Sequence, residues 1–338
     1  MGTGPERGTV PNLGDRPPNG ASGGGKRAAG THRARQLGTF AGLLALCVLL
    51  WAATPHFLTV SNLLNVLEQT ALNAIIAMGM TYVIISGGID LSVGSVLAFS
   101  GIGLALALEH SVPAPAAIVI ALAMGTACGL ANGALITLGR LPPFIATLGM
   151  MSVARGAALM LAEGRPISGF GEGFRAIAAA RVAGIPAPVL ITIVIYAVAH
   201  FVLTRTVFGR VTYAIGGNEE AARLSGVPVR GYKTAVYGVA GLASAAAAVV
   251  LTARLNSAQP TAGTMYELDA IAAAVIGGSS LLGGEGSQTG TLIGALIMGV
   301  LRNGLNLLNV SSFLQQVVIG VVIVGAVLVD MSLKRRRS

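Results

Sequence analysis

Charged residues are scarce in this chain. They make up 10% of its 338 residues, whereas an ordinary soluble domain carries about 25%. Hydrophobic residues make up 54% of the chain. A globule in water must still cover itself with polar groups, so this composition excludes a chain folded as one water-facing domain. The sequence therefore predicts that lipid surrounds most of the protein's surface.

Aromatic residues, cysteines and histidines are also few. Aromatics make up 5% of the chain, against 47 glycines. Small residues let membrane helices approach closely, so an α-helical bundle is favoured over a barrel of alternating polar and apolar strands. Cys47 and Cys128 lie inside apolar runs and the four histidines are scattered, so we expect no disulfide, no metal site and no cofactor. Because no catalytic constellation is present either, the sequence predicts a protein that is not an enzyme.

The net charge is +9, yet nucleic acid is not the expected partner. The basic residues gather in the two tails and in one central loop, without aromatic residues among them. That distribution is typical of the cytoplasmic flanks of a membrane protein.

The N-terminal segment 1–35 is rich in glycine, proline and arginine, and its composition predicts a disordered, basic cytoplasmic tail. Within it, Gly20 to Lys26 matches the start of a phosphate-binding P-loop. Arg27 stands where that motif needs Ser or Thr, and no strand is expected before it. Any ATP hydrolysis is therefore expected from another chain. Residues 333–338 form a second basic tail.

Between the tails, residues 36–332 read as one transmembrane domain. Its apolar runs are close to the length of about 20 residues that spans a bilayer as a helix. The sequence predicts an all-α, polytopic membrane helix bundle with about ten transmembrane helices. The runs are 37–54, 70–86, 91–108, 114–138, 143–162, 186–204, 234–254, 268–283, 288–308 and 312–331.

Charge predicts the orientation of these helices. The tail 1–35 carries +4 (six basic minus two acidic residues), the loop 205–233 carries +3 (five minus two), and the C-terminal tail is also basic. All three should be cytoplasmic by the positive-inside rule. Six spans lie before the loop and four after it, and an even number of crossings returns the chain to the same side of the membrane. The loop 163–187 is then placed outside. We expect a multi-pass protein of a bacterial inner membrane with both termini in the cytoplasm.

Two glycine-rich segments, 87–95 and 277–287, interrupt apolar regions in opposite halves of the chain. Such breaks leave backbone groups unpaired, so they must be buried in protein or line a wet cavity. Broken segments in two halves of a transporter are typical of a solute path.

The loop 205–233 contains a predicted short helix. Asn218 can cap it, Glu219 and Glu220 suit its positive end, and Glu219 can pair with Arg223 one turn later. Gly226 closes the helix at a position that favours a left-handed backbone angle. Two turns are not stable alone, so the helix needs a partner surface, either on another protein or on its own domain. The contact residues expected are Ala221, Ala222 and Leu224.

The stretch from Glu220 to Gly226 matches E-A-A-x-x-x-G, the coupling motif by which permeases of ABC importers dock on their ATPase, although the further I-x-L-P part is absent. Together with segment 87–95 and Gly209-Arg210, it makes residues 37–331 resemble the permease subunits of the ribose/xylose/galactose-type ABC importers (monosaccharide, carbohydrate-uptake class 2). The coupling residues implied by this resemblance are Asn218, Glu219, Glu220, Ala221, Ala222, Arg223, Leu224 and Gly226.

The resemblance also implies partners and a mechanism. The partners are an ABC ATPase subunit that binds the ATP, an extracytoplasmic solute-binding protein and a second permease copy, either identical or a paralogue. The mechanism is alternating access that imports a pentose-like monosaccharide, such as ribose or xylose, or a related small polar solute. The alternative function is a stand-alone secondary transporter or channel, which would be expected to bury more ionisable residues than Asp90 and Arg302.

Four residues are candidates for the translocation pathway. An intramembrane acid such as Asp90 is a functional candidate, but Asp90 with Ser92 can equally cap the helix that begins near Leu91. Asn132 and Asn303 can line a polar path or bond across helices. Arg302 can reach toward an interface or pair with an acid.

Overall fold

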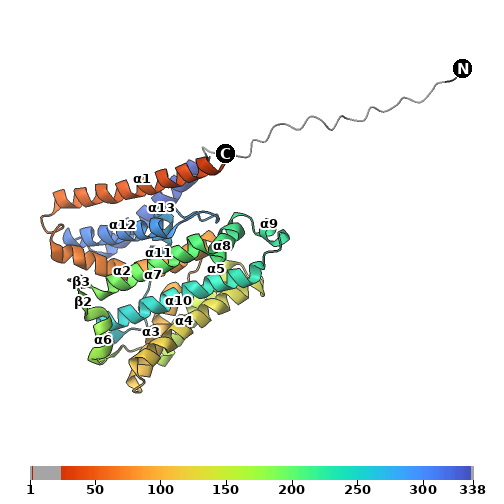
Figure 1. Ribbon diagram of the computed structural model, residues 1–338. Helices are drawn as coiled ribbons and strands as arrows, with labels where there is room; N and C mark the ends of the chain where they lie inside the picture. Colours follow the sequence, from red (N-terminus) through yellow and green to blue (C-terminus); the bar gives the residue numbers. More distant parts are fainter. Residues whose placement is uncertain (1, 3–23, 336–338) are drawn as a thin grey trace.

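The computed structural model describes residue 2 and residues 24–335, with side chains from 37 to 328 except residue 326. Within these ranges the chain folds into thirteen helices and four strands of two residues each (Figure 1). The helices of the first half are α1 (Gly24–Ala53), α2 (Val60–Ile85), α3 (Val93–Glu109), α4 (Ala114–Thr137), α5 (Pro143–Leu161) and α6 (Glu172–Ala179). The helices of the second half are α7 (Ala187–Arg205), α8 (Val207–Gly217), α9 (Glu219–Leu224), α10 (Val229–Leu255), α11 (Tyr266–Ile276), α12 (Gln288–Leu307) and α13 (Ser312–Arg335).

The strands form two small antiparallel ladders. β1 (Ile167–Ser168) pairs with β4 (Ser257–Ala258), and β2 (Arg181–Val182) pairs with β3 (Ile185–Pro186). The first ladder ties the segment after α5 to the end of α10. The second is a hairpin that leads directly into α7.

Helices α2 and α10 form the centre of the bundle. In their most apolar stretches 61% and 72% of the residues are buried, against 22% in α4 and in α5. Helix α4 meets α10 through glycines spaced four residues apart: a side chain at Gly125, Gly129 or Gly133 would overlap α10. This close approach is the packing that small residues allow in membranes, and it leaves the larger apolar side chains of α4 on the outside.

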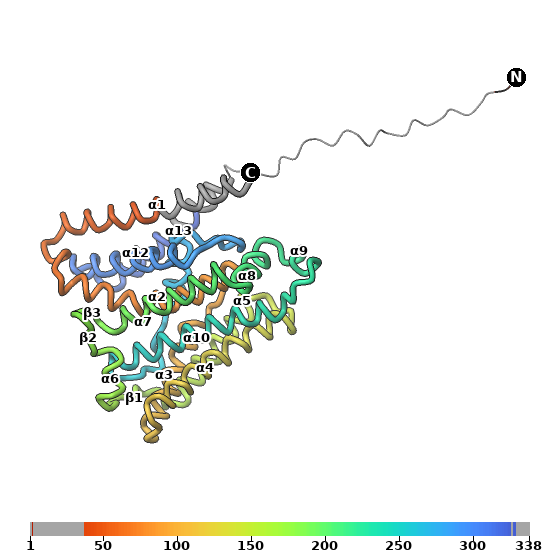
Figure 2. Tube along the Cα trace, in the orientation of Figure 1, coloured from red at the N-terminus to blue at the C-terminus, as the bar shows by residue number. Residues whose placement is uncertain are grey.

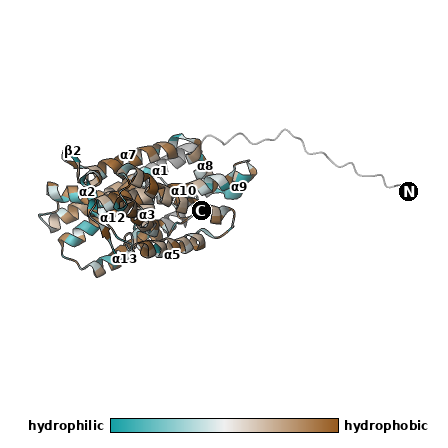
Figure 3. Ribbon diagram, turned by 90° about the horizontal axis from the view of Figure 1, so that it is seen from below, coloured by the Kyte–Doolittle hydropathy of each residue, from teal (hydrophilic) through white to brown (hydrophobic). Residues whose placement is uncertain are grey.

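The two ends of the bundle differ in content (Figures 1 and 2). Helix α9 lies at one end, where α8 ends and α10 begins, and helix α6 with the β2–β3 hairpin lies at the opposite end. The first half of α1 and the end of α13 lie toward the end that carries α9. Hydrophobic residues dominate the middle of the bundle, whereas hydrophilic ones gather toward its ends, α9 among them (Figure 3).

Six helices are long and apolar enough to cross a membrane: α2, α4, α5, α7, α10 and α12. Shorter apolar helical stretches are Leu37–Ala53 in α1, Val93–Glu109 in α3 and Ser312–Gly325 in α13. Each of the ten predicted runs overlaps a helix, but α11 has 11 residues, too few to span a bilayer alone. The protein is therefore a polytopic helical membrane protein, and the count of ten spans is not established.

One predicted boundary differs from the structure. Helix α1 begins at Gly24, inside the segment 1–35 that the sequence assigned to a disordered tail, so residues 24–35 are helical. Alanine and arginine favour helices, and α1 extends its apolar stretch backward through them. The rest of that predicted tail, apart from residue 2, lies outside the described residues, as do residues 336–338 of the C-terminal tail.

Candidate functional site

Helix α9 has the ends that the sequence predicts. The Asn218 side chain accepts a hydrogen bond of 2.9 Å from the backbone N–H of Ala221, which satisfies one of the free donors of the first turn. Gly226 follows the helix with φ +82°, a left-handed angle at which a β-carbon is strained. The N-cap at Asn218 and the left-handed angle at Gly226 are both as the sequence predicts for the ends of this helix.

The ion pairs of α9 differ from the prediction. Glu219 does not pair with Arg223; its carboxylate accepts a bond of 2.7 Å from Lys233 of α10. Arg223 pairs instead with Glu220, also at 2.7 Å. Because Glu219 faces α10, its carboxylate is drawn to the mostly buried ammonium there, and Glu220 is left beside Arg223 on the outer face. The hydrogen bond and the charge of Glu220 raise the pKa of Arg223.

The two faces of α9 have different surroundings. Ala222 is 7% exposed and packs with Ile215 of α8 and Val229 of α10, so one face rests on the chain's own domain. Ala221 is exposed, and Leu224 is 78% exposed. A large apolar side chain held on a capped and ion-paired helix offers a contact to a partner. One face of α9 is therefore buried on the chain's own domain, and the other face is exposed.

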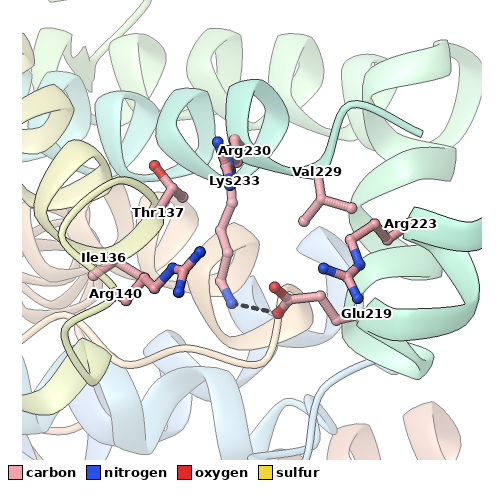
Figure 4. A pocket seen from close by; sticks show the side chains of 8 residues that line it. All are labelled: Ile136, Thr137, Arg140, Glu219, Arg223, Val229, Arg230 and Lys233. Atoms are coloured by element: carbon pink, nitrogen blue, oxygen red, sulfur yellow. Dashed lines mark hydrogen bonds and ion pairs between the residues drawn. The ribbon is translucent and has the colours of Figure 1, made fainter. Parts of the chain in front are cut away.

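A cavity of about 420 Å³ lies between α9 and the end of α4 (Figure 4). Glu219 and Lys233 bond across it, Arg223 borders it on the α9 side, and Arg140 borders it on the α4 side. Arg230 lines it as well. Four basic groups face one acidic group here, so the surface beside α9 is strongly positive.

A glycine junction connects α8 with both glycine-rich breaks. A β-carbon on Gly216 would overlap the carbonyl oxygen of Ile85 and come within 2.6 Å of the Gly284 nitrogen. That nitrogen donates a bond of 2.9 Å to the same Ile85 carbonyl. The Tyr213 hydroxyl adds a bond of 2.7 Å to the carbonyl of Gly286. The end of α2, segment 277–287 and the helix that leads into α9 therefore meet backbone to backbone.

Three of the four predicted pathway residues form one buried cluster. The Asp90 carboxylate, 1% exposed, accepts bonds from the Ser92 N–H at 2.8 Å and the Ser92 hydroxyl at 2.6 Å. Asn132 of α4 donates to the Ser92 hydroxyl at 2.9 Å. Helix α3 starts at Val93, two residues later than expected. Asp90 thus bonds Ser92, in the turn just before α3, much as a helix cap would. Asn132 of α4 bonds the same Ser92 hydroxyl.

This cluster has unused hydrogen-bonding capacity. Asn132 Oδ1 is buried and has no partner among the residues the structure describes, and the same holds for the Tyr237 hydroxyl of α10. That hydroxyl lies against Gly88, where a β-carbon would overlap it. Sequence reasoning missed Tyr237, because no local pattern relates it to the break at residues 87–95.

The fourth candidate, Asn303, lies apart from Asp90. Its amide exchanges two hydrogen bonds with Asn62, at 2.9 and 3.0 Å, and so joins the beginning of α2 to the end of α12. From the sequence, Asn303 could either line a polar path or bond across helices. The structure shows the bond across helices.

Arg302 pairs with an acid, one of the two alternatives that the sequence left open. Its guanidinium donates a bond of 2.8 Å to Asp269 of α11, whose side chain is 4% exposed, and Asn73 donates to the same carboxylate oxygen at 3.3 Å. Sequence reasoning did not single out Asp269. The signal was present, since Asp269 is an acid within the apolar run 268–283. In the part of the chain that the structure describes, no group of three or more His, Cys, Asp or Glu side chains is placed to hold a metal ion.

Comparisons with known proteins identify the family. Residues 62–327 match the family described as branched-chain amino acid transport system / permease component. The ribose import permease protein RbsC of Bacillus subtilis (strain 168) is 50% identical over 298 residues, 88% of this chain and 92% of that protein.

Two relatives from Escherichia coli (strain K12) are more distant. The D-allose transport system permease protein AlsC is 39% identical and covers 87% of this chain and 90% of its own length. The xylose transport system permease protein XylH is 36% identical, and the match covers 85% of this chain and 88% of XylH. No solved structure matches the chain. The chain belongs to this family of transport-system permease components, and it is a non-catalytic, multi-pass membrane subunit of an ABC importer.

Proposed function

We propose that this chain is the permease of an importer for ribose or a closely related monosaccharide. The observation that carries the proposal is the 50% identity to a ribose import permease across 92% of that protein's length. The permease moves its solute by alternating access, which a separate ATPase drives. The runner-up function, a stand-alone carrier or channel, has no comparable support.

The ATPase docks on α9 within the cytoplasmic loop 205–233. The docking surface includes the exposed Leu224 and the outer ion pair of Glu220 and Arg223. Asn218 and Gly226 define the ends of the helix, Glu219 and Ala222 fasten it to the domain, and Ala221 adds a small exposed surface. Through the close packing at Gly216, a movement of α9 would be transmitted to the end of α2 and to segment 277–287.

The same proposal names the other partners. An extracytoplasmic solute-binding protein delivers the monosaccharide, a second permease copy (identical or paralogous) completes the translocation unit, and the ATP stays on the ATPase. The exposed apolar side chains of α5, α7 and α13, among them Met160, Phe201 and Phe313, face lipid. The chain carries no cofactor and contacts no nucleic acid.

The proposed topology has ten crossings with both termini in the cytoplasm. It divides the chain into a tail (1–35), a transmembrane domain (36–332) and a second tail (333–338). The arrangement in Figure 1, with α9 and the first half of α1 at one end and α6 with its hairpin at the other, supports it. The solute path runs from the outer end, where Asn303 lies, toward the cluster of Asp90, Ser92 and Asn132.

The test is reconstitution of this chain in liposomes with its ATPase and binding protein. We expect uptake of labelled D-ribose that requires ATP and all three proteins. Ribose uptake by the permease alone would favour a stand-alone carrier. ATP-dependent uptake of leucine without ribose would overturn the monosaccharide assignment.

A further inference from the structure

A second polar cluster lies in the half of the bundle away from α9. It joins Thr70 and Asn73 of α2, Arg254 in the last turn of α10, Asp269 of α11 and Arg302 of α12. These side chains line a cavity of about 120 Å³, which admits one edge of a small polyhydroxylated molecule rather than the whole of it. The cavity is only partly enclosed: the side chain of Asp269 is 4% exposed, whereas that of Arg302 is 37% exposed.

The charges around this cavity are already paired. Asp269 pairs with Arg302 at 2.8 Å, and Arg254 pairs with Glu68 at 3.3 Å. A zwitterion such as an amino acid would find no unpaired charge among these four groups. A neutral solute needs only hydrogen bonds, and these are available: both described bonds to Asp269 fall on Oδ2, whereas a carboxylate offers about four acceptor sites.

Thr70 supplies an independent observation. The residue is 4% exposed, it lines the cavity, and its hydroxyl has no hydrogen-bond partner among the described residues. Thr81, about three turns further along the same helix, bonds the carbonyl four residues earlier at 2.7 Å, as buried helical threonines commonly do. A buried hydroxyl without a partner costs stability. Room for it is left by Gly299 of α12, where a β-carbon would overlap the Thr70 hydroxyl.

We infer that this cavity binds the hydroxyl-bearing edge of a small, neutral, polyhydroxylated solute within the permease. Neighbouring hydroxyls of the solute donate to Asp269 and bond the Thr70 hydroxyl, while Asn73 and Arg302 donate to its oxygens. The inference rests on the proposed function for the identity of that solute as a monosaccharide. It adds that the permease itself recognises the solute, at a place between the outer end and the cluster at Asp90.

A cysteine reporter on the full-length permease tests the site without any transport. Gln69 lines the same cavity and is exposed, so Gln69→Cys in a background lacking Cys47 and Cys128 should react with a small methanethiosulfonate reagent. We expect D-ribose, D-xylose or D-allose to slow the labelling at millimolar concentration, and L-leucine to have no effect. The proposal is overturned if none of the three sugars slows the reaction, or if leucine alone does.

Thr70→Val in the reporter protein tests the hydroxyl. A structural role predicts no loss, since the change removes an unpaired buried group. A binding role predicts that the half-protective sugar concentration rises, by about fivefold for one uncharged hydrogen bond. Ser100→Ala is the matched control, because the Ser100 hydroxyl of α3 is also buried without a partner in the described structure and does not line this cavity.

The control should keep the wild-type half-protective concentration, and neither variant should melt below the wild-type protein, since each removes an unpaired buried hydroxyl. Equal values for Thr70→Val and wild type would overturn the inference. Because the reporter works without the ATPase, its failure is separate from a failure of ATP-driven ribose uptake, which would overturn the proposed function instead.

Discussion

Gly216 and Gly226 stand on either side of α9, and each is required for a different physical reason. At Gly226 the reason is the backbone angle: φ is +82° and the space around a β-carbon is empty. At Gly216 the reason is space, because a β-carbon would overlap the backbone of Ile85. Substitutions at the two positions therefore separate backbone strain from a lost close approach.

Gly226→Val should impair ATP-driven uptake without preventing membrane insertion. The left-handed angle costs a β-branched residue about 1–2 kcal/mol, and relief of that strain would tilt or fray α9. The measurement is solute-stimulated ATP hydrolysis by the reconstituted complex, alongside uptake. Gly231→Val is the control, since that glycine of α10 also has open space around it and carries no positive φ. Full coupling in Gly226→Val would contradict the prediction.

Gly216→Ala should lower the melting temperature of the purified permease and reduce coupling. Overpacking of this kind costs about 1–3 kcal/mol, because backbone atoms rather than a flexible side chain must move. The neighbouring Gly217→Ala is a close control, as nothing lies within 4 Å of a β-carbon there. Equal melting temperatures for the two variants would show that the junction is not tightly packed.

At the scale of the element, α9 is a helix of six residues that could not persist alone in water. Its cap, its bond to Lys233 and the burial of Ala222 hold it on the domain. These contacts leave Leu224 outside. An apolar side chain that is mostly exposed on a well-fastened helix is suited to enter a pocket on a partner.

Leu224→Ser should weaken binding of the ATPase and leave the permease's own stability unchanged. Truncation of a central apolar contact costs about 2 kcal/mol, roughly 30-fold in affinity. The affinity is measured by titration of the ATPase into the permease in nanodiscs, with Leu224→Met as the volume-conserving control. Wild-type affinity of the serine variant would remove Leu224 from the docking surface.

At the scale of the whole molecule, apolar and charged surfaces are segregated. Val194 and Phe201 of α7 and Phe313 of α13 are more than half exposed, whereas the basic surface lies at the end that carries α9. Exposed apolar area of this extent is stable only against lipid or protein. The orientation of the bundle in the membrane then follows from which end holds the basic surface.

Cysteine labelling in intact cells tests that orientation. In a background lacking Cys47 and Cys128, single cysteines at Ser22, Ser225 and Ser338 should resist a membrane-impermeant thiol reagent. A cysteine at Ser168, in the ladder between β1 and β4, should react readily. Labelling of Ser225→Cys in intact cells would contradict the proposed topology. Labelling in permeabilised cells is the control that shows each cysteine to be reactive.

Local patterns were sufficient for much of this protein. Low charge and long apolar runs determine a helical membrane bundle, because lipid leaves the backbone no other partner than itself. Asn218 and Gly226 determine the two ends of α9, since capping involves residues within one turn of each other. The resemblance that names the family also rests on short contiguous stretches.

Contacts between distant residues were decided only by the tertiary structure. Glu219 bonds Lys233 rather than Arg223 because the packing of α9 beside α10 brings that carboxylate next to the Lys233 ammonium. Asp269 meets Arg302 and Asn73 from three different helices, and Gly216 meets Ile85 across more than a hundred residues of chain. Composition and periodicity constrain which face of a helix is apolar; they carry no information about which partner that face meets, because side-chain pairing depends on the three-dimensional packing of the helices.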